Sequence, residues 1–254
     1  MKKLVAGLAG VGAVLSMVMP SVALAQAAAA PEASPLTFNA GVASEYRYRG
    51  ISQSRFQPAL QGGADYAFSN GFYLGTWAST IKWVKDSGGK ANVELDVYGG
   101  YKGEITKDVT YDVGALQYLY PSHKLGVSPN TLELYGALTH GPFTAKYSHS
   151  TTNLFGFSNS KNSGYLDLSA TFDLGDGVML TPHAGHQKVA GSVAGVSNKV
   201  FSYTDYSLSI SKDYAGWVPS LTLLKTNATT GAYVAPNGKQ LGRSGVVAAV
   251  KYNF

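Results

Sequence analysis

Apolar and polar residues alternate along most of the chain from Thr37 onward. Successive side chains of a β-strand point to opposite faces, so alternation predicts strands with one apolar face and one polar face. The clearest run is Val93-Glu94-Leu95-Asp96-Val97, where aliphatic side chains share one face and carboxylates share the other. Residues 165–172 and 205–211 repeat the pattern. The chain is therefore expected to be all-β.

The alternating runs predict about twelve strands. Their expected spans are 37–50, 57–69, 72–84, 92–102, 109–120, 130–140, 143–152, 164–173, 178–188, 201–212, 217–226 and 243–254. Tight turns rich in Gly, Asn and Asp alternate with longer connections, although those around Ser52 and Asp86 are expected to be shorter. This alternation is typical of a transmembrane antiparallel up-and-down β-barrel whose two ends both lie in the periplasm.

The chain ends in an alternating strand with a terminal aromatic residue, VVAAVKYNF. Tyr252 and Phe254 on its apolar face resemble the assembly signal read by the outer-membrane insertion machinery. The last strand is expected to pair with the first, because an open sheet edge in lipid leaves backbone groups unpaired. The alternative is the C-terminal strand of a soluble periplasmic β-sandwich.

Residues 1–25 have the pattern of a cleavable signal peptide. Two lysines precede the apolar run 4–19, and Ala23-Leu24-Ala25 places the predicted cut between Ala25 and Gln26. The alternative, a retained anchor, is disfavoured because a membrane-spanning helix needs about 20 apolar residues. Residues 26–36 are expected to form an Ala/Pro-rich periplasmic lead-in, and residues 37–254 the barrel.

Composition narrows the class of protein further. Charged residues make up 14% and hydrophobic residues 45% of the chain, and the mean hydropathy is -0.02. A helical membrane protein is more apolar, and a disordered chain less so. The absence of Cys excludes disulfides and thiolate metal sites. Without Lys2 and Lys3 the chain has 18 basic and 15 acidic residues, too even a balance to indicate a nucleic-acid partner.

Three segments carry a family resemblance: YRYRGISQS at 46–54, QPALQGGADY at 57–66 and GFYLGTWAS at 71–79. They resemble the TorF-like porins, a proteobacterial family formerly of unknown function. The resemblance implies an outer-membrane barrel and a porin role, and it brings no catalytic residues. Beyond residue 79 only the strand rhythm and the C-terminal Phe are similar.

The polar strand faces identify candidate pore-lining residues. A Lys or Arg facing the middle of a bilayer costs about 2–4 kcal/mol, so charged side chains are expected to face inward. On strand parity these are Glu45, Arg47, Arg49, Asp65, Lys82, Glu94, Asp96, Lys102, Asp112, Glu133, Lys146, Asp167, Asp205 and Lys251. Both signs occur, which fits either a hydrated channel or internal ion pairs that plug the barrel. Arg47 and Arg49 form either a cationic step near the outer mouth or a structural pair with Glu45.

Aromatic residues and histidines suggest further sites. Tyr73, Trp77, Trp83, Trp217 and Tyr252 are candidates for the aromatic girdles at the two membrane interfaces. His149 lies between two serines, but neighbours on a strand face opposite ways, so a Ser–His pair is not expected. The same argument separates His183 from His186. We therefore expect no catalytic residues, no metal and no cofactor.

Together these patterns favour a porin-like channel in the outer membrane of a Gram-negative bacterium. It would pass small hydrophilic solutes or ions by passive diffusion. Its expected partners are outer-membrane lipid, the assembly machinery and those solutes. The alternatives are a structural or surface-interaction barrel with a plugged interior, and a barrel-embedded hydrolase.

Overall fold

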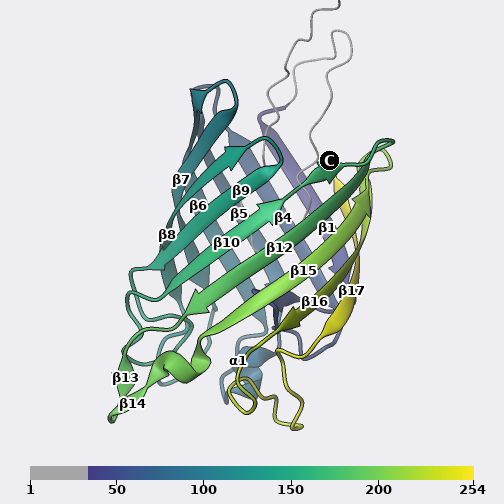
Figure 1. Cartoon of the computed structure of the whole chain (residues 1–254). Helices are drawn as coiled ribbons and strands as arrows, with labels where there is room; N and C mark the ends of the chain where they lie inside the picture. The colour runs from purple at the N-terminus through teal and green to yellow at the C-terminus, as the bar shows by residue number, and fades with distance from the viewer. Residues whose placement is uncertain (1–33) are drawn as a thin grey trace, which may run out of the picture.

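The first and last long strands of the chain lie side by side in a computed structural model that describes residues 34–254 (Figure 1). β1 (Leu36–Ala43) pairs antiparallel with β17 (Gly245–Asn253). The register runs from Asn39 opposite Asn253 to Ala43 opposite Ala249. Because a second pairing, between β10 and β12, joins the other two edges, the sheet closes on itself. The predicted transmembrane-type antiparallel barrel is confirmed as a fold, and the soluble two-sheet sandwich is excluded.

Twelve strands form the wall in the described part of the chain, as the alternation predicts. Between β1 and β17 they are β4 (Ala59–Ala67), β5 (Phe72–Thr80), β6 (Val93–Thr106), β7 (Val109–Leu119), β8 (Thr131–His140), β9 (Phe143–Ser150), β10 (Gly164–Ala170), β12 (Val178–Lys188), β15 (Tyr203–Lys212) and β16 (Trp217–Thr226). β11 (Phe172–Asp173) continues β10 along β12.

The connections separate by length between the two ends of the barrel. Short turns such as 107–108 and 141–142 lie at the end that carries the C-terminus, here called the short-turn end (Figure 1). The connections 44–58, 81–92, 120–130, 151–163, 189–202 and 227–244 lie at the opposite, long-loop end. The expectation of shorter connections around Ser52 and Asp86 is wrong, because the strands predicted over 37–50 and 72–84 end at Ala43 and Thr80.

Small elements occupy the long connections. They are β2 (Arg47–Tyr48), β3 (Ile51–Ser52), α1 (Trp83–Asp86), β13 (Ser192–Val193), β14 (Val196–Ser197) and the 3-10 helix η1 (Asn198–Phe201). No helix within residues 34–254 is long and apolar enough to cross a membrane.

The wall is apolar outside and polar inside, the reverse of a soluble protein. Aliphatic side chains on the outer faces are roughly half exposed, among them Leu60, Leu74, Leu134, Leu168, Leu223 and Val246. The opposite faces carry buried polar residues such as Glu94, Glu133 and Asp205. An exposed apolar belt this extensive is unusual for a soluble monomer and typical of a transmembrane barrel.

The N-terminal predictions lie mostly outside the described residues. The signal peptide, the cut between Ala25 and Gln26, and all but the end of the 26–36 lead-in fall before residue 34.

Candidate functional site

A short hairpin folds into the barrel where the sequence predicts a continuous strand. β2 and β3 pair through Arg47 with Ser52 and Tyr48 with Ile51. The two residues between them, Arg49 and Gly50, have φ of 46° and 78°. Positive φ at both positions is the geometry of a tight two-residue hairpin turn, and glycine adopts it without steric strain. We call residues 45–54 the inner hairpin.

The inner hairpin corrects the predicted placement of three charged residues. Glu45, Arg47 and Arg49 are expected on the inner face of the first strand, but that strand ends at Ala43. The alternation of Tyr and Arg over residues 46–49 has the period of a strand. The turn at Arg49 and Gly50, however, reverses the chain, so that β3 pairs with β2. All three charged side chains are buried in the hairpin.

Arg49 anchors the tip of the hairpin to the far wall. Its Nη1 and Nη2 donate to Oε1 and Oε2 of Glu133 on β8, at 3.1 and 2.7 Å. Nη1 also donates to Oε1 of Gln187 on β12 at 2.6 Å. The guanidinium lies 4.2 Å from the ring centre of Tyr165 on β10. Burial alone would lower the pKa of Arg49, but Glu133, Tyr48 and Tyr118 raise it, so it lies above its ordinary value. The tip stays positively charged.

Arg47 ties the base of the hairpin to the last long loop. Its side chain donates to both carboxylate oxygens of Glu45, at 2.8 and 3.0 Å. It also donates to the carbonyls of Leu241 and Arg243, at 2.9 and 3.0 Å. Of the two roles left open for Arg47, the geometry supports the structural pair with Glu45, because the guanidinium donates to a carboxylate and to backbone carbonyls of the protein itself.

Two tyrosines fasten the hairpin to the remaining wall. The Tyr46 hydroxyl donates to Glu94 on β6 at 2.6 Å. The hydroxyls of Tyr48 and Tyr118, on β7, lie 2.8 Å apart. On the other side, a Cβ on Gly50 would lie 2.5 Å from Cγ2 of Thr226 on β16. The inner hairpin therefore reaches from β6 and β7 across to β16.

Most of the other predicted charges lie on the inner face of the wall. These are Asp65, Glu94, Asp96, Asp112, Glu133, Lys146, Asp167, Asp205 and Lys251, each at the strand parity opposite the exposed aliphatic residues. Lys82 does not. It is exposed at the long-loop end, in the connection before α1, because β5 ends at Thr80. A pore-lining role for the inward residues stays a prediction.

Tyrosines and basic groups cover several of these inward carboxylates. The hydroxyls of Tyr73 and Tyr98 donate to Asp112 and Asp65, each at 2.6 Å. Nζ of Lys102 lies 3.9 Å from Asp112. These contacts make the β4–β7 side of the interior a linked polar network.

Asp96 differs from these carboxylates. Its side chain is completely buried on the inner face of β6, and neither carboxylate oxygen has a hydrogen-bond partner. Glu94, two residues earlier on the same face, accepts hydrogen bonds from Tyr46 and Tyr120. A buried carboxylate without donors is costly, and such groups concentrate where function requires them.

Three of the five predicted girdle aromatics face elsewhere. Tyr73 and Trp77 are buried inside the barrel, and Trp83 packs edge-on against Tyr120 at the long-loop end, with ring centres 5.0 Å apart. The outward positions of β5 are instead held by Phe72 and Leu74, which are 54% and 57% exposed. Trp217 is 53% exposed at the short-turn end, and its ring centre lies 4.6 Å from that of Tyr252. This position at one end of the apolar belt fits a girdle residue.

The histidines do not assemble the arrangements considered above. Ser148 and Ser150 are buried on the inner face of β9, whereas His149 occupies the opposite parity. His183 faces inward and His186 is exposed on the outside.

His183 does lie between two carboxylates, although they are too far from it in sequence for their spacing to predict the contact. Its Nε2 is 3.1 Å from Asp167 on β10, and its Nδ1 is 3.6 Å from Asp205 on β15. The signal that could have found this cluster is the shared inward parity on three strands that turn out to be adjacent.

One side of the interior, along β17, is lined mostly by small residues that the rest of the protein covers only in part. The inward positions of β17 are all half-buried from the long-loop end to the short-turn end. They are Gly245, Val247, Ala249, Lys251 and Asn253. By contrast, the inward residues Glu94, Asp96 and Tyr98 of β6 are fully buried. Among the described wall strands, β17 is the one in which no inward side chain is fully buried, so a path through the barrel would meet the least side-chain packing there.

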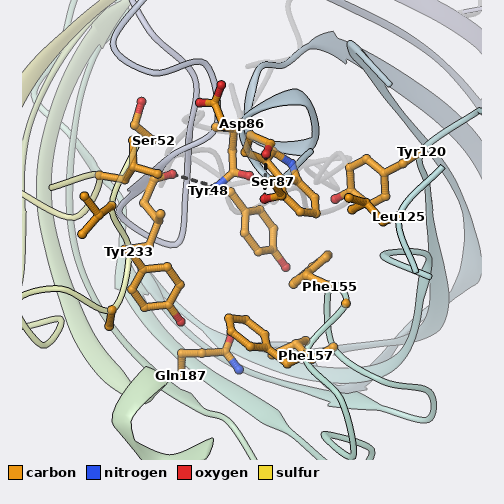
Figure 2. Close-up of a pocket in the computed structure, with 18 of the residues that line it drawn as sticks. Tyr48, Ser52, Asp86, Ser87, Tyr120, Leu125, Phe155, Phe157, Gln187 and Tyr233 are labelled. Atoms are coloured by element: carbon orange, nitrogen blue, oxygen red, sulfur yellow. Dashed lines mark hydrogen bonds between the residues drawn. The ribbon is translucent and has the colours of Figure 1, made fainter. Parts of the chain in front are cut away.

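A cavity of about 460 Å³ lies above the inner hairpin at the long-loop end. Figure 2 shows Tyr48, Tyr120, Phe155 and Tyr233 around it, drawn from the hairpin and three long connections. The sequence gives no indication of this cavity, because most of its lining residues lie in connections without a repeating pattern.

Comparison with known proteins places the chain in a family. Residues 27–254 match the family described as "bacterial protein of unknown function (Gcw_chp)", so the chain belongs to that family. The TorF-like name is not part of this match and stays a prediction. No curated protein matches the chain.

Two solved structures have a similar fold. A KdgM porin in complex with disordered oligogalacturonate is 9% identical, with a TM-score of 0.54. A NanC porin is 11% identical, also with a TM-score of 0.54. Each alignment covers 86% of this chain and 98% of the other. At such low identity the likeness concerns the fold alone.

Proposed function

We propose that this member of the Gcw_chp family is an outer-membrane channel that lets small hydrophilic solutes or ions diffuse passively, narrowed by the inner hairpin. The observation that carries the proposal is the half-buried inner face of β17, which runs from Asn253 at the short-turn end to Gly245, where it meets the Arg47–Glu45 pair of the hairpin. Twelve-stranded barrels lie between small barrels filled by side chains and wide porins. The porin names of KdgM and NanC, and the resemblance to TorF-like porins, support the same role.

In this proposal the apolar belt faces outer-membrane lipid. The long-loop end faces the cell exterior and the short-turn end faces the periplasm, as in bacterial outer-membrane barrels. Export would use the predicted signal peptide, and insertion would use the C-terminal strand ending at Phe254.

The inner hairpin would act as the constriction. It is anchored to β6, β7 and β8 through Tyr46, Tyr48 and Arg49, and its turn reaches across to Thr226 on β16. Solutes would then pass along the inner face of β17 and past Lys251. The narrowest point would lie between Gly245 and Arg47, where an added Cβ would be 2.9 Å from Nη2.

A second candidate is a barrel plugged by the same hairpin. The complete burial of the Arg49–Glu133 ion pair, with both side chains 1% exposed, favours it. Such a protein would act through its loops as a structural or surface-binding barrel.

Single-channel recording on the refolded mature protein in a planar lipid bilayer separates the two. A channel gives stepwise currents with the unmodified protein. The double variant Arg49→Gln/Glu133→Gln releases the tip without leaving one buried charge alone, and it should give larger steps. Lys82→Gln, at the exposed rim, is the control and should leave the steps unchanged.

Correctly folded, inserted protein without steps would exclude the channel. If steps then arose only in the double variant, the hairpin would be a plug.

A further inference from the structure

Seven of the described residues that line the cavity at the long-loop end, here called the loop cavity, are aromatic. Tyr48 comes from the inner hairpin, Trp83 from α1, Phe155 and Phe157 from the 151–163 connection, and Tyr233 from the 227–244 connection. Ring-lined concave sites of about 300–1,000 Å³ are typical of small-molecule binding, and this one measures about 460 Å³.

The rings are held in place by edge-on contacts. Tyr48 and Phe155 have ring centres 5.3 Å apart and planes at 78°. Phe157 and Tyr233 have centres 6.2 Å apart and planes at 81°. In an edge-on pair, the ring that contributes its edge keeps its own faces clear of its partner, so a flat ligand can stack there.

The loop cavity carries no net charge from its side chains. Among the described residues that line it, Asp86 is the only ionisable acid or base other than tyrosine. Arg55 neutralises Asp86, with Nε donating to Oδ2 at 2.8 Å and a second guanidinium contact to Oδ1. The two arginines of the inner hairpin are directed to Glu45 and Glu133 instead. An acidic solute would find no free cation in the lining.

Polar groups are present at the edge of the loop cavity. Gln53 and Ser87 bring amide and hydroxyl groups to its lining (Figure 2 labels Ser87), whereas the amide of Gln187 is already hydrogen-bonded to Arg49, Gly164 and Lys188. A few polar groups around apolar walls fix the orientation of a bound molecule.

We infer that the loop cavity binds an uncharged ring-shaped solute with an apolar face and a hydrogen-bonding edge, and holds it above the constriction. Both a sugar ring and an aromatic alcohol have this chemistry. The inference rests on the proposed function in assigning the captured molecule to a channel, but binding itself does not require conduction.

The test is equilibrium binding to the full mature protein refolded in detergent, followed by calorimetry and by Trp fluorescence, to which Trp83 in the lining contributes. Three probes are titrated separately: sucrose, benzyl alcohol and galacturonate. Saturable binding of either neutral probe, with galacturonate at least tenfold weaker, supports the inference. The neutral probe that binds shows whether the ligand is a sugar ring or an aromatic alcohol.

Phe155→Leu and Tyr233→Leu remove a ring while keeping an apolar side chain. Each should weaken binding of the neutral probe about fivefold, because a stacked ring contributes roughly 1 kcal/mol and 1.4 kcal/mol corresponds to a factor of ten. Phe143→Leu is the matched control, since Phe143 is 59% exposed at the short-turn end.

Because Phe155 packs against Tyr48 and Tyr118, its variant could unfold the loops. Phe157→Leu and a circular dichroism spectrum keep the test valid in that event. The inference is overturned if neither neutral probe binds saturably, if galacturonate binds as tightly, or if Phe143→Leu weakens binding equally. Binding without conductance would refute only the channel.

Discussion

Arg49 and Glu133 are 84 positions apart in sequence, yet they form a two-point ion pair inside the barrel, with both side chains 1% exposed. The guanidinium donates to both carboxylate oxygens, an arrangement that is stronger and more directional than a single contact. Removing two charges from water is costly unless they remain paired. The pair therefore holds the tip of the inner hairpin against β8.

Removing one member of this pair should destabilise the protein strongly. Arg49→Ala leaves Glu133 buried without its partner, and we expect a loss of about 3–5 kcal/mol in the free energy of unfolding. Urea titration of the refolded protein, followed by Trp fluorescence, measures it. Lys82→Ala at the exposed rim should change stability by less than about 0.5 kcal/mol. An Arg49→Ala variant as stable as this control would show that the hairpin is held by other contacts.

Substitution of Gly50 should reduce the free energy of unfolding more than substitution of Gly238, a glycine with the same φ. Gly50 and Gly238 both have φ of 78°, but only at Gly50 would a Cβ meet neighbours, at 2.5 Å from Thr226 and 2.9 Å from Asp205. Gly238→Ala should cost about 1–2 kcal/mol for the left-handed backbone alone, and Gly50→Ala more than that. Urea titrations of both variants give the comparison. Equal losses would mean that the hairpin tip moves away from the wall freely.

Phe254 should matter for insertion more than other exposed aromatics. It exchanges both backbone hydrogen bonds with Phe38, at 2.8 and 3.0 Å, and their rings stack 5.8 Å apart. Removing its ring with Phe254→Ala weakens the seam between the first and last strands, whose open edges would be costly in lipid. The folded fraction in outer-membrane preparations should fall at least severalfold, and Phe143→Ala should leave it unchanged. Equal yields of the two variants would contradict a special role for the C-terminal ring.

Lys251 should influence which ions pass if the barrel conducts. Its side chain lies on the half-buried inner face of β17, where a path along that strand would bring passing ions close to its charge. Lys251→Gln should therefore shift the reversal potential in a salt gradient toward cation preference. Asp96→Asn is the matched control, because Asp96 is completely buried without a hydrogen-bond donor, which disfavours a charged carboxylate. An identical reversal potential in both variants would exclude Lys251 from the field that ions experience.

The candidate site was only partly accessible from the sequence. Strand parity correctly separates inward Glu94 and Glu133 from the outward aliphatic residues, because alternation is a local property of each strand. It misplaces Lys82 and the three hairpin charges, because the same alternation continues past the ends of β1 and β5. The loop cavity cannot be predicted from strand parity, because most of its rings come from connections without a periodic pattern.

The sequence by itself determined the all-β class, the strand count and the closing C-terminal strand, because a period of two is written in neighbouring residues. The tertiary structure alone decided that residues 45–54 leave the wall and cross the interior. That choice depends on Glu94, Glu133 and Gln187, which lie on β6, β8 and β12 and reach the hairpin only after the barrel has closed. Local alternation is the same whether Tyr and Arg lie on a wall strand or on a hairpin. A buried charge is stable only beside its partner, and the position of that partner is set by the tertiary fold.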